Sequence, residues 1–273
     1  MKGLQGTTAI VTGGASGIGQ AVAVRLAREG ANVAINYVGP PDGAEATRTT
    51  IEAGLDACMC AMRDEGARPL LVEADVSDAD EVATMFDQAV ATFGRVDHLV
   101  NNAGIQLAAP SHELDVAAFD RVLAVNLRGS FLCAQRHLAH LVDEGRPGSI
   151  VNISSVHQEI PKPRFVGYSV SKGGMQNLTR TLALEYADRG IRVNAVAPGA
   201  TITPINRAWV EDPEKSAQVT AHIPMGRAGT ADEMAAVTAF LFSDEAAYIT
   251  GQTIFVDGGL TLFADFRSTW SSE

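Results

Sequence analysis

The chain has 273 residues, of which 21 are Lys or Arg and 32 are Asp or Glu, so its formal net charge is −11. Because 46% of the residues are hydrophobic and no apolar run approaches the roughly 18 residues of a membrane span, the composition excludes a disordered chain and a membrane protein. The acidic balance and the absence of a basic stripe also argue against a nucleic-acid partner.

The first residues run directly into an apolar strand pattern at Thr7, without the charged region, apolar region and cleavage site of a secretory signal. We therefore expect a cytoplasmic protein. From Thr7 onward, short β-branched runs alternate with longer stretches of helical period. Strands are predicted over 7–12, 32–36, 69–73, 96–100, 148–153, 192–196 and 253–256, and helices over 17–29, 43–63, 79–93, 117–142, 167–188 and 231–241.

This alternation predicts an α/β fold, in which a single Rossmann-type, doubly wound, parallel sheet of seven strands carries helices on both faces. The strands at 9–11 and 98–100 lack polar alternation, as expected when helices cover both faces. We expect one dinucleotide-binding and catalytic domain over 1–273, with a substrate-side region around 200–225 and a C-terminal tail over 258–273. The long connection 38–68 has no purpose that the sequence reveals.

A glycine-rich loop, Thr-Gly-Gly-Ala-Ser-Gly-Ile-Gly over residues 12–19, follows the first predicted strand and opens directly into a helix. Glycines let the backbone turn sharply and approach a pyrophosphate, whose charge is favoured by the N–H groups at a helix N-terminus. The spacing differs from G-x-G-x-x-G, and an ordinary strand-to-helix turn also fits it. By itself the loop leaves both interpretations open.

Polar and small residues follow three later strands, namely Asp75-Val76, the segment 101–104 and Pro198-Gly199. The carboxyl ends of strands are where an open α/β sheet binds its ligand, so one ligand could contact all three segments. A single Asp or Asn after a strand is more often a turn former. The indication therefore comes from the agreement of three strand ends.

Tyr168 and Lys172 stand four residues apart, so a helix presents both side chains on one face. A unit charge about 4 Å from a phenol supplies roughly 4 kcal/mol at an effective dielectric near 20, about what is needed to lower a tyrosine pKa from near 10 to about 7. Such a tyrosine exchanges protons with an alcohol or carbonyl oxygen, which Ser155, at the end of the fifth strand, could also hold. Taken alone, the two residues also fit an exposed helical pair; the glycine loop and Ser155 favour hydride-transfer chemistry.

Together these motifs resemble those of the short-chain dehydrogenase/reductase family over essentially the whole chain: Thr-Gly-x-x-x-Gly-x-Gly, Asn-Asn-Ala-Gly, Ser followed by Tyr-x-x-x-Lys, and Pro-Gly. The resemblance implies an oxidoreductase that uses NAD or NADP. It also implies that Asn126, Ser155, Tyr168 and Lys172 are catalytic, with Asn126 holding a water-linked proton relay to Lys172.

The same resemblance implies a cofactor site. Its residues would be Gly13, Ser16, Ile18 and Gly19 at the diphosphate, Asp75 and Val76 at the adenine, Asn102, Ala103 and Gly104 along the cofactor body, Pro198, Gly199, Thr201 and Thr203 at the nicotinamide end, and Tyr168 and Lys172 near the nicotinamide ribose. Asn36 ends the second strand, where an acidic residue would select NAD and an Arg would favour NADP. Since Asn36 and Tyr37 are neither acidic nor Arg, the choice between NAD and NADP stays open.

A narrower resemblance, to the bacterial glucose 1-dehydrogenases of this family, is carried by 110–113, 154–157, 203–206 and 223–226. It puts Gln106, Ser155, His157 and Asn206 near the substrate, where polar groups suit a sugar. The leading hypothesis is oxidation of an aldose such as glucose at C1 to a lactone. Another polyol, a sugar acid or a 3-oxoacyl compound is the alternative substrate, and a non-catalytic nucleotide sensor is the alternative of another class.

Lys162 and Arg164 stand where the resemblance leads us to expect aromatic or aliphatic residues. They indicate either an acidic substrate or a solvated loop, and we favour the loop because Lys and Arg are usually exposed.

Assembly and metal binding are the remaining questions. The helices predicted at 117–142 and 167–188 resemble those through which the family dimerises, and a homotetramer is expected. His137 and His140 lack a third ligand, so we predict a surface or subunit contact and no metal site. For Cys58, Cys60 and Cys133 no metal or redox role is expected.

Overall fold

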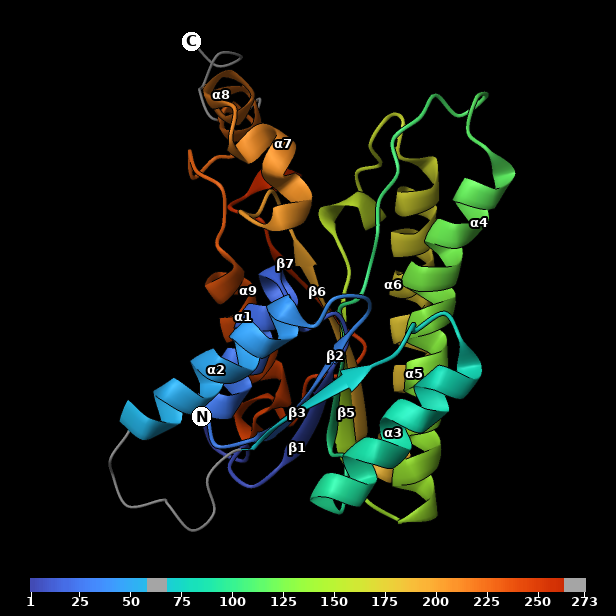
Figure 1. The fold of residues 1–273 in the computed structure, drawn as a ribbon. Coiled ribbons are helices and arrows are strands. Elements are labelled where there is room, and N and C mark those ends of the chain that lie inside the picture. The colour runs from blue at the N-terminus through green and yellow to red at the C-terminus, as the bar shows by residue number, and fades with distance from the viewer. Residues whose placement is uncertain (58–67, 263–273) are drawn as a thin grey trace.

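The protein folds around one parallel sheet of seven strands in the order β3-β2-β1-β4-β5-β6-β7, which confirms the predicted fold class (Figure 1). The structure is a computed structural model and describes residues 1–57 and 68–262. The strands are β1 (Thr8–Val11), β2 (Asn32–Tyr37), β3 (Pro69–Glu73), β4 (His98–Asn101), β5 (Gly148–Ile153), β6 (Ile191–Pro198) and β7 (Thr253–Val256).

Helices cover both faces of the sheet, with α1, α2 and α9 on one face and α3, α4, α5 and α6 on the other (Figure 1). Each helix layer packs against the sheet and forms a separate apolar core with it. In the part of the chain that the structure describes, the helices are α1 (Gly17–Arg28), α2 (Asp42–Ala57), α3 (Ala79–Phe93), α4 (Val116–Leu123), α5 (Gly129–Asp143), α6 (Val166–Tyr186), α7 (Arg207–Val210), α8 (Pro213–Ala221) and α9 (Ala231–Phe242). No helix within the described ranges is long and apolar enough to span a bilayer.

Strand β1 shows why apolar residues follow one another in a central strand without polar alternation. All four of its residues are buried, and successive side chains point to opposite faces. Ala9 and Val11 belong to the core under α1 and α9, whereas Ile10 belongs to the core under α3 and α5. A polar residue at any of these positions would be buried against a helix layer.

Two segments differ from the sequence prediction or extend it. The single helix predicted over 117–142 is interrupted, because a turn of π-helix, Ala124–Arg128, separates α4 from α5. The region 200–225 contains the short helices α7 and α8, which the sequence did not predict. Cys58 and Cys60, the end of the helix predicted over 43–63 and most of the tail predicted over 258–273 lie outside the described residues.

The surface position predicted for His137 is wrong. This side chain is fully buried in α5, where its ring lies 6.1 Å from the ring of Phe86. Burial lowers the pKa of His137 to about 3. His140, one turn later, is half-buried, and its Nε2 accepts a hydrogen bond from the backbone N–H of Val96 at 3.2 Å. Helix α5 packs the side that carries His137 against the sheet, which the residue type alone does not reveal.

The connections after β1 and β4 diverge, although the two strands are neighbours in the sheet. After β1 the chain forms α1 on one face, whereas the elements beyond β4 cover the other face (Figure 1). The carboxyl ends at such a switch point leave a crevice in which open α/β sheets bind ligands. The glycine-rich loop follows β1, and the segment beginning with Asn102 follows β4, so both lie at this crevice.

Candidate active site

The loop after β1 has a shape that only small residues permit. Gly13 and Gly17 both have positive φ, at 61° and 54°. A Cβ on Gly19 would overlap the Gly13 carbonyl oxygen and the Asn102 side-chain amide. The side chain of Ser16, which precedes α1, makes no capping hydrogen bond, so it does not occupy the first N–H groups of the helix. This arrangement fits a diphosphate group.

Thr12 ties this loop to the segment after β4. Its Oγ1 accepts hydrogen bonds from the backbone N–H groups of Asn102 at 2.9 Å and Ala103 at 3.0 Å, and it donates to the carbonyl of Val100 at 3.1 Å. In return, the Asn102 side chain donates to the carbonyls of Thr12 at 2.9 Å and Gly13 at 3.1 Å. The two strand ends therefore form one hydrogen-bonded unit.

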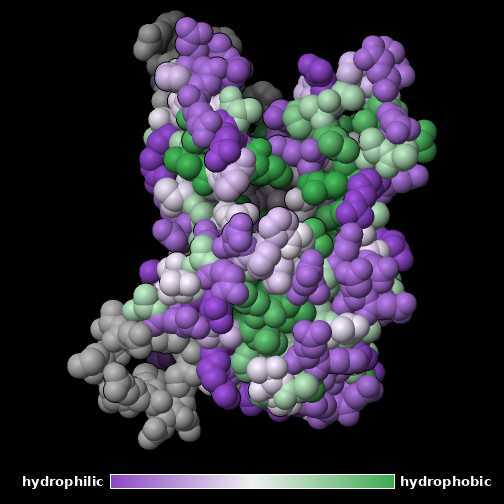
Figure 2. All heavy atoms as spheres, viewed as in Figure 1, coloured by the Kyte–Doolittle hydropathy of each residue, from purple (hydrophilic) through white to green (hydrophobic). Residues whose placement is uncertain are grey.

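A cavity of about 920 Å³ opens on this unit and extends between the α7–α8 region and the N-terminal part of α6. Figure 2 shows the molecule hollowed between its two upper arms. Most of the predicted site residues line this cavity: Gly13, Ser16, Ile18, Asn102, Ala103, Gly104, Gln106, Ser155, His157, Tyr168, Lys172, Pro198, Gly199, Thr201, Thr203 and Asn206.

Five predicted site residues do not line the cavity: Gly19, Asn36, Asp75, Val76 and Asn126. Asn36 is buried, and its amide bridges the glycine loop to the chain after β3, because Oδ1 accepts from Gly13 N at 3.2 Å and Nδ2 donates to Ala74 O at 2.9 Å. The Asp75 carboxylate binds Arg121 at 2.9 Å. The adenine contacts of Asp75 and Val76 stay predictions.

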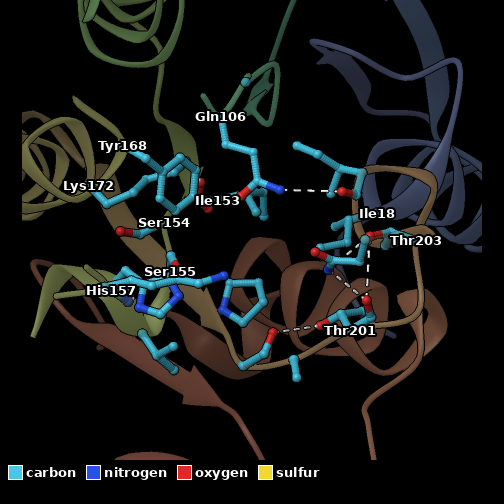
Figure 3. A pocket seen from close by; sticks show the side chains of 18 of the residues that line it. Ile18, Gln106, Ile153, Ser154, Ser155, His157, Tyr168, Lys172, Thr201 and Thr203 are labelled. Carbon is cyan, nitrogen blue, oxygen red and sulfur yellow. Dashed lines mark hydrogen bonds between the residues drawn. The ribbon is translucent and has the colours of Figure 1, made fainter. Parts of the chain in front are cut away.

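The predicted catalytic groups meet at one end of the cavity (Figure 3). Tyr168 and Lys172 lie on successive turns of α6, with the Lys172 Nζ 5.6 Å from the centre of the Tyr168 ring. Lys172 Nζ also donates to the carbonyl of Ile153, at the end of β5, at 2.7 Å. Ser155 follows that strand, and its Oγ accepts a hydrogen bond from the backbone N–H of His157 at 3.1 Å.

The electrostatics of this group differ from the sequence expectation. Burial raises the pKa of Tyr168, and its hydrogen bond with Ser155 acts in the opposite direction. Burial also lowers the pKa of Lys172 to about 8. The net pKa of Tyr168 is therefore raised and not lowered as predicted, because desolvation disfavours the charged forms of both residues.

Asn126 lies in the π-helical turn and is fully buried. Its Oδ1 accepts from Ile105 N at 2.8 Å, while Nδ2 donates to Ile105 O at 2.9 Å and to Ser171 Oγ at 3.1 Å. This side chain links the segment after β4 to the helix that carries Tyr168 and Lys172. Its role in a proton relay stays a prediction.

The other end of the cavity has a mixed lining. The amide nitrogens of Gln106 and Asn206 donate to the carbonyls of Ile205 at 3.3 Å and Thr201 at 2.9 Å, which leaves their side-chain oxygens available as acceptors. His157 Nδ1 lies 2.8 Å from the carbonyl of Ile160, so it carries the proton and Nε2 is the acceptor. The sequence reasoning missed further lining residues. The predicted substrate-side region was the only indication of Ile205, Trp209, Val219 and His222, and Ile160 and Leu260 lie outside that region.

The fold, the glycine loop and the adjoining tyrosine and lysine define a dinucleotide-binding α/β oxidoreductase. Comparison with known proteins is more specific. A family model described as enoyl-(acyl carrier protein) reductase matches residues 13–261. The chain belongs to the short-chain dehydrogenase/reductase family, and the protein is an NAD(P)-dependent oxidoreductase.

Similar proteins carry different substrate names. The chain is 47% identical to 3beta-hydroxysteroid dehydrogenase 1 of Eggerthella lenta, over 97% of both chains. It is 44% identical to glucose 1-dehydrogenase of Gluconobacter oxydans, over 98% of this chain and 96% of the relative. A solved structure from Agrobacterium tumefaciens with bound NADP superimposes with a TM-score of 0.83 at 35% identity, over 95% of this chain and 98% of that one.

Proposed function

We propose that Tyr168 removes the hydroxyl proton of an alcohol substrate while the carbon bearing that hydroxyl transfers a hydride to the cofactor. The oxidised nicotinamide supplies the hydride acceptor. Ser155 holds the reacting oxygen, and the Lys172 ammonium favours the phenolate. In the reverse direction, Tyr168 returns the proton to the carbonyl oxygen. The observation that carries this proposal is the meeting of these three side chains in the cavity onto which the glycine loop opens.

For the substrate, we infer an aldose such as glucose, oxidised at C1 to its lactone. Sugar hydroxyls are hydrogen-bond donors, and the substrate end of the cavity offers acceptors in Gln106 Oε1, His157 Nε2 and Asn206 Oδ1. The similarity to glucose 1-dehydrogenase of Gluconobacter oxydans supports the same substrate class.

A specific observation favours a second candidate, an alcohol on an apolar ring system. Ile160, Trp209 and Val219 line the substrate end of the cavity and provide apolar contact area that a sugar does not need. The similarity to 3beta-hydroxysteroid dehydrogenase 1 points in the same direction. The two candidates share their chemistry at Tyr168 and differ in what the rest of the substrate contacts.

We also propose a homotetramer. Large apolar side chains stand exposed on the helix layer formed by α4, α5 and α6: Val116 is 69% exposed, Phe131 42%, Val170 48% and Leu184 85%. Burying such groups between copies removes apolar surface from water.

A substrate screen tests the proposed function. The purified protein is incubated with NAD⁺ or NADP⁺ and with aldoses, linear polyols or 3-hydroxysteroids, and the absorbance of the reduced nicotinamide is followed. We expect turnover of at least one aldose, with the lactone as product. Turnover of hydroxysteroids alone would replace the first candidate with the second, and no turnover of any alcohol would contradict both.

A further inference from the structure

The charge of the cavity is opposite to that of the chain. The formal net charge is −11, yet none of the described residues that line the cavity is an Asp or Glu, and two are lysines. Lys172 is one of them, and the catalytic proposal already uses it. Lys162 is the other, at the substrate end, and nothing in the proposed chemistry requires a cation there.

Lys162 has no counter-charge within the described ranges, since its Nζ lies within ion-pair distance of none of the carboxylates that the structure describes. Instead, its Nζ lies 4.2 Å from the centre of the Phe165 ring. An aromatic face attracts a cation without neutralising it. Lys162 is exposed, and partial desolvation of its ammonium lowers its pKa.

The loop that carries Lys162 is fixed in position. Arg164 O accepts a hydrogen bond from Ala109 N at 2.9 Å, which joins the loop to the segment after β4, and Phe165 N donates to Lys162 O at 3.2 Å. Arg164 has a φ of 71°, and among the described residues it is the only one other than glycine with a positive φ. Such a conformation is unfavourable for a residue with a Cβ, so surrounding contacts must maintain it. The loop is therefore exposed but held in one conformation.

The groups around Lys162 also favour an anion. Burial lowers the pKa of the neighbouring His157, and the charge of Lys162 adds to that effect, so the imidazole is neutral near pH 7 and does not repel the lysine. Helix α6 begins at Val166, directly after the loop, and no side chain caps its N-terminus. The partial positive charge of that end has the same sign as the ammonium.

We propose that Lys162 binds a carboxylate of the substrate, so that the natural substrate is an acidic member of one of the two proposed classes, such as an aldose that carries a carboxylate, with its reacting hydroxyl at Tyr168. This inference rests on the proposed function and specifies its substrate class. A hydrogen bond between an ammonium and a carboxylate is stronger than one between neutral groups, so Lys162 would discriminate acids from neutral analogues. Arg164, which does not line the cavity, takes no part.

Matched pairs of substrates test this proposal. Glucose and glucuronate differ only in the replacement of a hydroxymethyl group by a carboxylate, and cyclohexanol and 4-hydroxycyclohexanecarboxylate differ only in the presence of one. For at least one pair, we expect the wild-type kcat/KM to be about tenfold or more higher for the acid, mainly through a lower KM. In Lys162→Met this ratio should fall about tenfold, and in Lys162→Glu it should fall further.

Arg164→Gln is the matched control, because it removes a neighbouring exposed cation from the same loop and should keep the wild-type ratio. Affinity for NADH, measured by its fluorescence, reports whether each variant is folded. A wild-type preference for the neutral member of both pairs, or an unchanged ratio in Lys162→Met, would overturn the proposal.

Failure of the proposed function would be visible separately, as absence of turnover with both pairs. Thermal unfolding with NADH and each acid then tests Lys162 by binding alone. The acid should raise the Tm of the wild-type complex more than its neutral analogue does, and Lys162→Met should abolish that difference. Equal shifts in the two proteins would reject the role of Lys162.

Discussion

The two ends of the cavity are built differently. At the cofactor end, the loop after β1 is held by backbone geometry and by neutral side chains such as Thr12 and Asn102, whose hydrogen bonds join two strand ends. At the substrate end, side chains from separate loops and short helices meet, among them His157, Lys162 and His222. The first end is suited to holding one invariant group, whereas the second is suited to discriminating between substrates.

Tyr168 lies where the two ends meet, so removing its hydroxyl should reduce turnover and leave cofactor binding unchanged. Tyr168→Phe removes the proton-transferring oxygen and keeps the ring, and we expect kcat to fall by about 10³-fold, within the usual range for general acid–base catalysis. The dissociation constant for NADH, titrated by fluorescence, should change by less than about threefold, because the cofactor end is unaltered.

Tyr248→Phe is the matched control, since Tyr248 is fully exposed and does not line the cavity. It should retain wild-type turnover. Near-normal kcat in Tyr168→Phe would contradict the proposed base, and a parallel loss of cofactor binding would contradict the separation of the two ends.

The same division explains what could be predicted from the sequence. Strand β1 and the loop after it were predictable because three consecutive buried apolar residues and a glycine cluster express local requirements. Asn126 could be named only through a family resemblance, and its π-helical turn was missed because the pattern of apolar residues runs through 117–142 without a break.

The substrate end was less predictable still. Trp209 and Val219 reach the cavity from the short helices α7 and α8, and no local pattern indicates that helices so far along the chain close over the carboxyl ends of the strands. Lys162 was interpreted as part of a solvated loop, and residues 161–164 are exposed as expected, but the sequence did not indicate that this lysine also lines the cavity. Its position in the cavity lining depends on the contact between its loop and Ala109, which is distant in sequence.

Gly19→Ala tests the backbone construction of the cofactor end. The added Cβ would overlap Gly13 O, a backbone atom, so the loop must shift away from Asn102. We expect the dissociation constants for NAD⁺ and NADP⁺, measured by calorimetry, to rise by at least about tenfold, together with a loss of stability of about 1–3 kcal/mol. Gly173→Ala is the matched control, because nothing lies within 4 Å of a Cβ at that position, and alanine is the better helix former. Equal cofactor affinity in the two variants would mean that the close approach at Gly19 is not required.

A change of pH should also affect the two ends of the cavity differently. Alcohol oxidation needs Tyr168 deprotonated, and burial raises the pKa of this residue, so kcat/KM for the alcohol should increase with pH from 7 to 9, by at most about tenfold per unit. Carbonyl reduction needs the protonated phenol and should decrease over the same range. Because the pKa of Lys172 is about 8, the amine loses its charge in this interval, which disfavours the phenolate and makes the rise shallower. The lining at the glycine loop contains neutral groups, so the dissociation constant for NADH should vary by less than about threefold. A cofactor affinity that follows pH more steeply than turnover would show that the titrating group acts on binding and not on the proton transfer at Tyr168.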